Sequence, residues 1–308
     1  MRDRLGLIIP FGLFGAFFLV YSIVWMISAG VMKDEIVAFA AREDERGRSF
    51  AYDGIKVAGY PMSLRAKIAD ASWTDGEEFG LTSSELQVIA LPYDVSRILF
   101  APQGERTITL FGTAYDLDAE NLLFSIERDF AAAEGQNFSL VNDERTVTFS
   151  NLIINRQNLN EGDTIAADVR DIDFGGELSI RVPVFQLSAG LTGQGLNIGA
   201  MDLAIGREDD PAPTSFQAEG VLTYDDAGLL SGELDVTFVN ERPVIMLLAE
   251  LGVFGSGQAQ LIAGGLSLLT DGGTRPTTLP LVIDKGEVYL TGLPIGRLPL
   301  GTIPPLAD

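Results

Sequence analysis

The chain opens with one long apolar segment. No charged residue interrupts Leu5–Met32, a run of 28 residues between Arg4 and Lys33. As an α-helix this run would measure about 42 Å, at roughly 1.5 Å per residue. That length exceeds the roughly 30 Å of hydrocarbon in a bilayer. Leu5–Met32 therefore predicts a helix that spans a membrane.

The charges that flank this run predict its orientation. Arg2 and Arg4 precede it, whereas Lys33 at its other end is followed at once by two acidic residues. Positive residues tend to stay on the cytoplasmic side of a membrane, so the N-terminus is expected in the cytoplasm. A cleaved secretory signal is the alternative, but its apolar core is usually about 7–15 residues long. The small-x-small site Ala38–Ala40 also lies beyond the charges, so we expect an uncleaved anchor.

The pattern changes after the anchor. Residues 33–48 favour a helix with charges on one side and apolar residues on the other, which predicts a helical stalk. Further along, the apolar residues Met62, Leu64, Ala66 and Ile68 alternate with polar ones. This period of two is typical of a half-buried strand. The row is expected to face inward.

Similar short runs recur throughout residues 49–308, which we interpret as one continuous domain. Turn sequences such as Asn142-Asp143 and Asp284-Lys285-Gly286 separate many of them. Strands joined by tight turns, without a helix between each pair, indicate antiparallel pairing. The sequence thus predicts a mainly β (α+β) fold with a large curved antiparallel sheet. The runs are Ala51–Val57, Leu86–Ala90, Arg97–Phe100, Thr107–Phe111, Phe138–Val141, Thr146–Phe149, Thr164–Asp173, Glu177–Phe185, Leu196–Ile205, Ser215–Thr223, Gly232–Val239, Pro280–Ile283 and Glu287–Thr291.

Residues 243–269 break the strand pattern and predict a helical hairpin. The first helix, Pro243–Leu251, has proline at a favourable first position, and the second runs from Ser256 to Leu269. A second membrane span is the alternative, because the segment is strongly apolar. Five glycines and the ionisable Glu250 disfavour that alternative. The helices are expected to flank the sheet.

Composition restricts the chemistry available to this chain. It contains no cysteine and no histidine, which excludes disulfides, thiolate or imidazole metal sites and histidine-based catalytic triads. Residues 33–308 carry 19 Lys and Arg against 42 Asp and Glu, a formal charge of −23. Such a charge repels nucleic acid, and we expect no nucleic-acid partner and no cofactor.

Two carboxylate-based possibilities remain. Asp168, Asp171 and Asp173 lie close together in sequence and could offer oxygen ligands to calcium. On a regular strand, however, Asp171 and Asp173 share one face while Asp168 points to the other, so solvated charges are favoured. A pair of carboxylates could also hydrolyse a glycosidic bond, but the sequence singles out no pair. We therefore assign no catalytic, cofactor or metal residue and expect no enzyme.

The segment Tyr52–Leu64 after the anchor and stalk, and the segments Leu279–Gly286 and Leu293–Pro299 near the end, resemble an uncharacterised membrane-anchored family of alphaproteobacteria, domain of unknown function 2125. The resemblance implies an inner-membrane protein with a periplasmic β-rich domain. More distantly, this architecture is similar to the AsmA-like envelope proteins, whose curved sheets can present an apolar groove to lipid. No functional residues carry over from it.

The sequence and the resemblance together suggest three functions. The first is a single-pass inner-membrane protein whose periplasmic domain binds lipid or another apolar envelope molecule, with Met62, Leu64, Ala66 and Ile68 as the ligand face. The second is a structural or interaction partner of an envelope complex. The third is a carboxylate-based hydrolase. In each case residues 1–32 form the cytoplasmic tip and anchor, residues 33–48 the stalk and residues 49–308 the periplasmic domain.

Overall fold

The computed structural model describes residues 2–91, 94–143, 145–159, 162–175, 181–192, 195–205, 214–225, 229–250, 255–270 and 275–297. Within these residues the chain has three helices and sixteen strands. It forms two compact units: unit 1 contains residues 1–114 and 123–128, and unit 2 contains residues 115–122 and 129–308. Residues 177–180 of one predicted strand, and Leu251 of the first predicted hairpin helix, lie outside the described residues.

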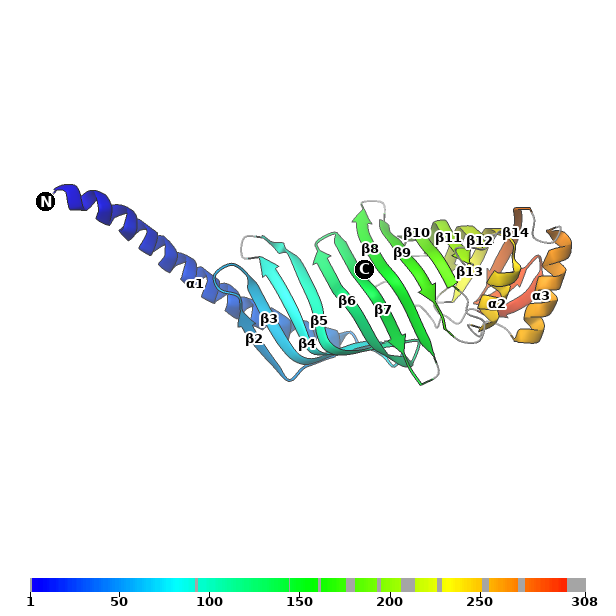
Figure 1. Ribbon diagram of the computed structural model, residues 1–308, viewed down its shortest axis with the longest axis horizontal. Coiled ribbons are helices and arrows are strands. Elements are labelled where there is room, and N and C mark those ends of the chain that lie inside the picture. Colours follow the sequence, from blue (N-terminus) through cyan, green and yellow to red (C-terminus); the bar gives the residue numbers. More distant parts are fainter. Residues whose placement is uncertain are drawn as a thin grey trace. The chain divides into compact units, whose positions relative to one another are not determined.

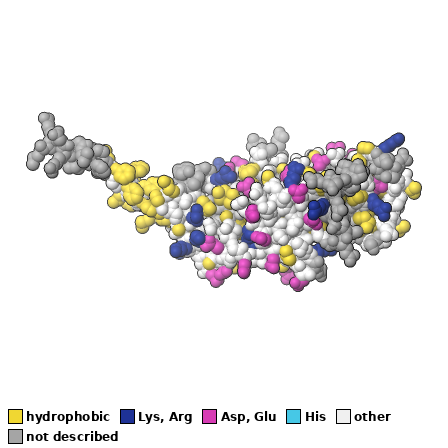
Figure 2. Space-filling model, viewed as in Figure 1, with side chains coloured by type: hydrophobic (Ala, Val, Ile, Leu, Met, Phe, Trp, Pro, Cys, Tyr) yellow, Lys and Arg dark blue, Asp and Glu magenta, His cyan; other side chains and the backbone are white. Residues whose placement is uncertain are grey.

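The N-terminal helix α1 (Arg2–Glu45) is continuous from the predicted anchor into the predicted stalk, and it ends three residues before the predicted end of the stalk at residue 48. It ends where Gly47 adopts a φ of +76°, a left-handed conformation that glycine tolerates without strain. Many large apolar side chains between Leu13 and Val31 are exposed, and Leu13 and Phe17 are each 68% exposed. Figure 2 shows the apolar surface on this part of α1. Among the described residues, α1 is the one helix long and apolar enough to cross a membrane.

Unit 1 is an antiparallel sheet against which α1 packs. β1 and β2 both pair with β3, and β3, β4 and β5 pair in succession. Its strands are β1 (Arg48–Ala51), β2 (Gly54–Ala58), β3 (Leu64–Asp75), β4 (Phe79–Leu91), β5 (Asp94–Leu110) and part of β6 (Thr113–Glu127). The core of the unit joins Ile36 of α1 to Ala66 and Ile68 of β3 and Val88 of β4.

Unit 2 is an antiparallel sheet in which successive strands from β7 to β16 are neighbours. Two helices, α2 (Arg242–Glu250) and α3 (Ser256–Leu269), interrupt the strands between β13 and β14. The strands are β7 (Phe130–Val141), β8 (Thr146–Leu159), β9 (Gly162–Asp173), β10 (Arg181–Thr192), β11 (Gly195–Ile205), β12 (Thr214–Tyr224), β13 (Leu230–Val239), β14 (Thr277–Asp284), β15 (Glu287–Leu290) and β16 (Leu293–Arg297). The predicted mainly β fold, with an N-terminal helix and a late helical hairpin, is confirmed (Figure 1).

The ladder of unit 1 contains a β-bulge held by a serine. Ser84 of β4 faces Gly104 and Glu105 of β5, and Gly104 has a φ of +74°. Ser84 Oγ accepts a hydrogen bond from the Glu105 amide at 3.1 Å. On the other side of Ser84, Asp70 of β3 interrupts the ladder with a φ of +48°. Because bulges bend a strand and increase its twist, this line of residues marks a local bend.

Unit 2 contains a similar arrangement, in which residues with positive φ on both neighbouring strands flank a serine, Ser150 of β8. Asn137 of β7 and Asp171 of β9 have φ values of +51° and +54° and interrupt the ladders on either side of it. Ser150 Oγ donates a hydrogen bond to a carboxylate oxygen of Asp171 at 2.6 Å. Asn and Asp are the non-glycine residues that best tolerate this conformation, so the sequence supports the bend.

Candidate apolar binding surface

The row predicted as a ligand face lies in the core of unit 1. Leu64, Ala66 and Ile68 are 3%, 0% and 1% exposed, and Ala66 and Ile68 belong to the cluster that includes Ile36 of α1. Met62 is not part of the row, because β3 begins at Leu64 and Met62 lies in the preceding turn, 80% exposed. The surface of the three strand residues is thus occupied by packing within the unit.

Unit 2 carries a larger apolar surface, here called the apolar strip. It consists of two transverse rows, each with one residue from each of the six neighbouring strands β8 to β13. The first row is Leu152, Val169, Phe185, Leu203, Phe216 and Phe238, and the second is Ile154, Ala167, Leu187, Met201, Ala218 and Val236. Members of the two rows are two residues apart on each strand, so all twelve side chains point to one face of the sheet.

Burial differs between the two ends of the second row of the apolar strip. In its second row Val236 and Ala218 are 0% and 3% exposed, Met201 and Leu187 are half-buried, and Ile154 is 38% exposed. The strip is therefore closed at its β12–β13 end and more open at its β8–β9 end, where Ile154 is exposed and Leu152, Ala167 and Val169 are half-buried.

The helical hairpin explains the closed end. Val244 and Ile245 of α2 and Ala259 and Leu266 of α3 are buried in the same cluster as Val236. Figure 1 shows α2 and α3 at the β13–β14 end of unit 2. The ends of the hairpin are fastened by Thr270, whose hydroxyl donates to the buried carboxylate of Glu241 at 3.1 Å. The hairpin thus covers only one part of the apolar face.

The dimensions of the apolar strip suit an elongated apolar molecule. Six strands at roughly 4.8 Å spacing extend about 24 Å across the sheet. The hydrocarbon of one bilayer leaflet is about half of the ~30 Å bilayer core, or ~15 Å. A surface without polar side chains offers no general acid, base or metal ligand, so it can bind through apolar contact alone.

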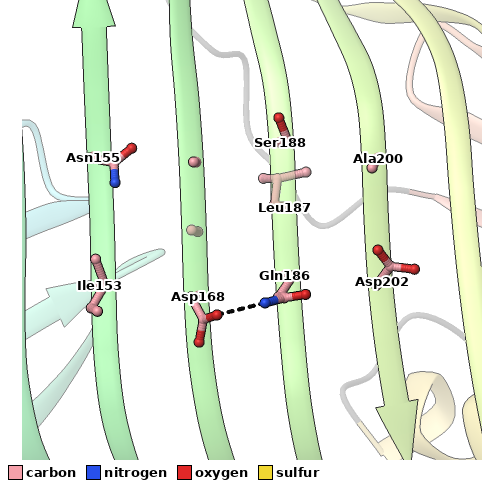
Figure 3. A pocket seen from close by; sticks show the side chains of 10 residues that line it. Ile153, Asn155, Asp168, Gln186, Leu187, Ser188, Ala200 and Asp202 are labelled. Atoms are coloured by element: carbon pink, nitrogen blue, oxygen red, sulfur yellow. Dashed lines mark hydrogen bonds between the residues drawn. The ribbon is translucent and has the colours of Figure 1, made fainter.

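The opposite face of unit 2 is polar and contains a shallow depression of about 300 Å³ (Figure 3). Gln186 donates to Asp168 at 2.7 Å, and Gln217 donates to Asp202 at 2.7 Å. The residues on this face that line the depression are Ile153, Asn155, Ala166, Asp168, Gln186, Ser188, Ala200 and Asp202. Ala167 and Leu187, which belong to the apolar strip, also border it. Its carboxylates already have hydrogen-bond partners within the sheet.

Asp168, which lines the depression, has a pKa that its surroundings change. Hydrogen bonds from the Arg170 guanidinium, and then from the Gln186 amide, hold the pKa of Asp168 below its ordinary value of 3.8. A glycosidase general acid needs the opposite change, a raised pKa. Asp168 is therefore an ionised acceptor near neutral pH.

The three aspartates considered for calcium have separate partners. These are Arg170 for Asp168, Ser150 for Asp171, and Arg181 for Asp173. The left-handed φ of Asp171 also interrupts the regular alternation of side chains on β9. In the described part of the chain, no three Asp or Glu side chains gather to form a possible metal site.

A protein-family comparison matches most of this chain. The model described as "Uncharacterized protein conserved in bacteria (DUF2125)" matches residues 25–178 and 210–299. These ranges include α1 from Trp25 onward, the whole sheet of unit 1 and both ends of the apolar strip. Searches of the curated proteins and of the solved structures found no match. The resemblance to AsmA-like proteins and the alphaproteobacterial origin stay predictions.

Proposed function

The chain belongs to the DUF2125 family of uncharacterised bacterial proteins, and we propose that it is a non-enzymatic, membrane-anchored module that binds lipid or another apolar envelope molecule on the apolar strip. The observation that carries this proposal is the burial gradient from Val236, fully buried under the hairpin, to Ile154, 38% exposed on the same row. Contiguous apolar surface left open on a folded protein is typical of an interaction site.

Placement at a membrane supports the same proposal. α1 is long and apolar enough to span a bilayer, and Arg2 and Arg4 before it favour an N-terminus in the cytoplasm. With that topology the two β-rich units lie in the periplasm, anchored to the inner membrane. The apolar strip of unit 2 is then in the same compartment as the outer leaflet of that membrane. The strongly acidic surface keeps the units soluble and disfavours adsorption to anionic head groups.

A photocrosslinking experiment tests the proposal on the full chain. The protein, purified in mild detergent, is mixed with a phospholipid carrying a photoactivatable group on one acyl chain, irradiated, and digested for mass spectrometry. We expect crosslinked peptides from β8 to β10 of the apolar strip. Crosslinks on α1 are expected in any case, because α1 is immersed in the micelle, and they serve as the internal control. Crosslinks confined to α1 would overturn the proposal.

A second candidate function, as a structural partner in an envelope complex, is favoured by the outer face of α3. Leu261 and Leu268 are 78% and 86% exposed there, and Ser256–Leu269 contains no charged residue. A photocrosslinking amino acid at Leu268 in whole cells tests this candidate. A discrete protein adduct that disappears in a Leu261→Arg background would support it, whereas no discrete adduct would count against it.

A further inference from the structure

The turn between β2 and β3 lies against the anchor helix. This turn, Gly59–Ser63, is held by two donors from α1: the Tyr21 hydroxyl donates to the Pro61 carbonyl, and the Trp25 indole donates to the Ser63 carbonyl at 3.0 Å. The hydroxyl groups of Ser22 and Tyr60 are also 2.7 Å apart.

Aromatic packing adds to these hydrogen bonds. The Tyr60 ring lies edge-on to the rings of Trp25 and Phe18, with centroids 5.3 Å and 6.1 Å away. The turn therefore meets α1 between Phe18 and Trp25, inside the apolar run. The predicted stalk, in contrast, begins only at residue 33.

The length of the apolar run places this contact in a membrane. The hydrocarbon core of a bilayer is roughly 30 Å thick, which a helix crosses in about 20 residues at roughly 1.5 Å per residue. If α1 enters the hydrocarbon at Leu5, it therefore leaves it near Val24. The turn thus lies at the level where α1 leaves the hydrocarbon. Tyr and Trp side chains favour this interfacial level, and both Tyr21 and Trp25 donate to the turn there.

The side chains of the turn suit the same environment. Gly59–Ser63 contains no charged residue. Tyr60 is 42% exposed and Met62 is 80% exposed, the largest exposure of any large hydrophobic side chain in the described part of unit 1. An unbranched thioether side chain adapts readily to mobile apolar surroundings.

The far end of α1 shows which way the sheet extends from this level. Trp73 near the end of β3 donates to Glu43 near the end of α1 at 3.0 Å, while Ser63 just before β3 accepts from Trp25. β3 therefore runs alongside α1, as Figure 1 also shows. At the opposite ends of the strands lies Phe111, directly after β5, with its ring edge-on to that of Phe79 of β4 at a centroid distance of 5.2 Å.

We infer that Gly59–Ser63 docks on the lipid bilayer where α1 leaves the hydrocarbon, with Met62 inserted among the acyl chains. This inference rests on the proposed membrane anchor. Unit 1 then stands directly on the membrane with its strands extending away from it, and residues 33–45 of α1 pack against the sheet instead of forming a free stalk.

Depth-dependent quenching tests the docking, and the absence of cysteine makes single-site labelling specific. Met62→Cys, Phe111→Cys and Val20→Cys variants of the full chain are labelled with an environment-sensitive fluorophore. Each is reconstituted into phosphatidylcholine–phosphatidylglycerol vesicles that contain lipids with a quencher at a defined acyl position. All three positions are at least half exposed, so labels are tolerated.

We expect the Met62 label to shift to shorter wavelength and to be quenched by a shallow acyl quencher. The Val20 label reports the anchor and is expected to be quenched most by a deeper quencher, while the Phe111 label stays unquenched. If Val20 is quenched and Met62 behaves like Phe111, the docking is wrong and the anchor stands. If Val20 is also unquenched, both the docking and the proposed anchor are overturned.

Discussion

Ile153 and Ile154 are neighbours on β8 and are 41% and 38% exposed, yet they lie on opposite faces of the unit 2 sheet. Ile153 pairs with Asp168 beside the polar depression, whereas Ile154 pairs with Ala167 at the open end of the apolar strip. The two residues have the same side chain and nearly the same exposure. They differ only in the face that they occupy.

This pair provides a matched test of the apolar strip. We expect Ile154→Glu to abolish crosslinking of the acyl-chain probe to β8–β10, because an ionised carboxylate cannot be buried under an apolar ligand without a partner. Ile153→Glu adds the same charge on the other face and is expected to keep wild-type crosslinking. Crosslink yields are normalised to those on α1. Equal yields for the two variants would show that the strip does not bind the probe.

The sequence predicts the helices and strands of this protein better than it predicts which residues of neighbouring strands pair. The uncharged run Leu5–Met32 and the strand alternation identify α1 and most strands, because both depend on local periodicity. The same alternation assigns Phe185 and Leu203 each to one face of a predicted strand. It does not show that they are opposite each other, because register is fixed by pairing across the sheet. The apolar strip therefore emerges only when six strands are aligned.

The predicted ligand face shows the same limit. Alternation correctly groups Leu64, Ala66 and Ile68, but it cannot distinguish a face covered by packing from one open to a ligand. It also extends the row to Met62, although the turn before β3 ends the strand pattern there. The contact between this turn and Trp25 spans 38 residues. No local pattern predicts such a contact.

The end of α1 is attached to unit 1 by a buried carboxylate. Glu43 is 2% exposed, accepts the indole N–H of Trp73 at 3.0 Å, and lies 3.2 Å and 3.6 Å from the guanidinium groups of Arg46 and Arg48. Trp73→Phe removes one hydrogen bond to a charged acceptor, worth about 1.5–3 kcal/mol. We expect faster amide hydrogen exchange at the end of α1, measured by mass spectrometry on the full chain.

Tyr289→Phe is the control for that prediction, because it removes an exposed hydrogen bond from Tyr289 to Glu287. Exposed pairs contribute little, so exchange around β15 is expected to stay near the wild-type rate. Unchanged exchange at the end of α1 in Trp73→Phe would mean that the helix is held there without this bond.

The ion pair of Asp168 predicts a dependence of stability on acid pH. Because the pKa of Asp168 is lowered in the folded protein, its contribution is present above the ordinary value of 3.8 and is lost as the pH falls through the folded pKa. We expect Asp168→Asn to lower the melting temperature of unit 2 at pH 6, with the difference from wild type shrinking below about pH 4. Thermal melts followed by circular dichroism measure it.

Arg170→Gln is the matched background, since it removes the main cause of the lowered pKa of Asp168. In that background Asp168→Asn is expected to change the melting temperature less at pH 6. If the wild type and Asp168→Asn differ equally at pH 6 and pH 3, the ion pair contributes no pH-dependent stability.

The bulge of unit 1 predicts that substitution by alanine costs more stability at Gly104 than at Gly47. Gly104 and Gly47 have similar φ values, +74° and +76°, but an added Cβ would fall on Ser84 Oγ at Gly104 and would meet nothing within 4 Å at Gly47. Gly47→Ala is expected to cost about 1 kcal/mol through the left-handed conformation alone. Gly104→Ala adds overpacking and is expected to cost about 2–3 kcal/mol in total. Urea unfolding of the full chain in mild detergent, followed by tryptophan fluorescence, measures both.

A double-mutant cycle separates the two causes at Gly104. Ser84→Ala removes the Oγ that the new methyl group meets, and it also removes the acceptor of the Glu105 amide. The double variant is therefore expected to be more stable than the sum of the two single costs predicts. The clash with Ser84 Oγ contributes to the cost of Gly104→Ala alone, and it is absent from the double variant. Simple additivity would show that Ser84 rotates away freely, and the bulge would then be held by the backbone of β4 and β5 without the serine.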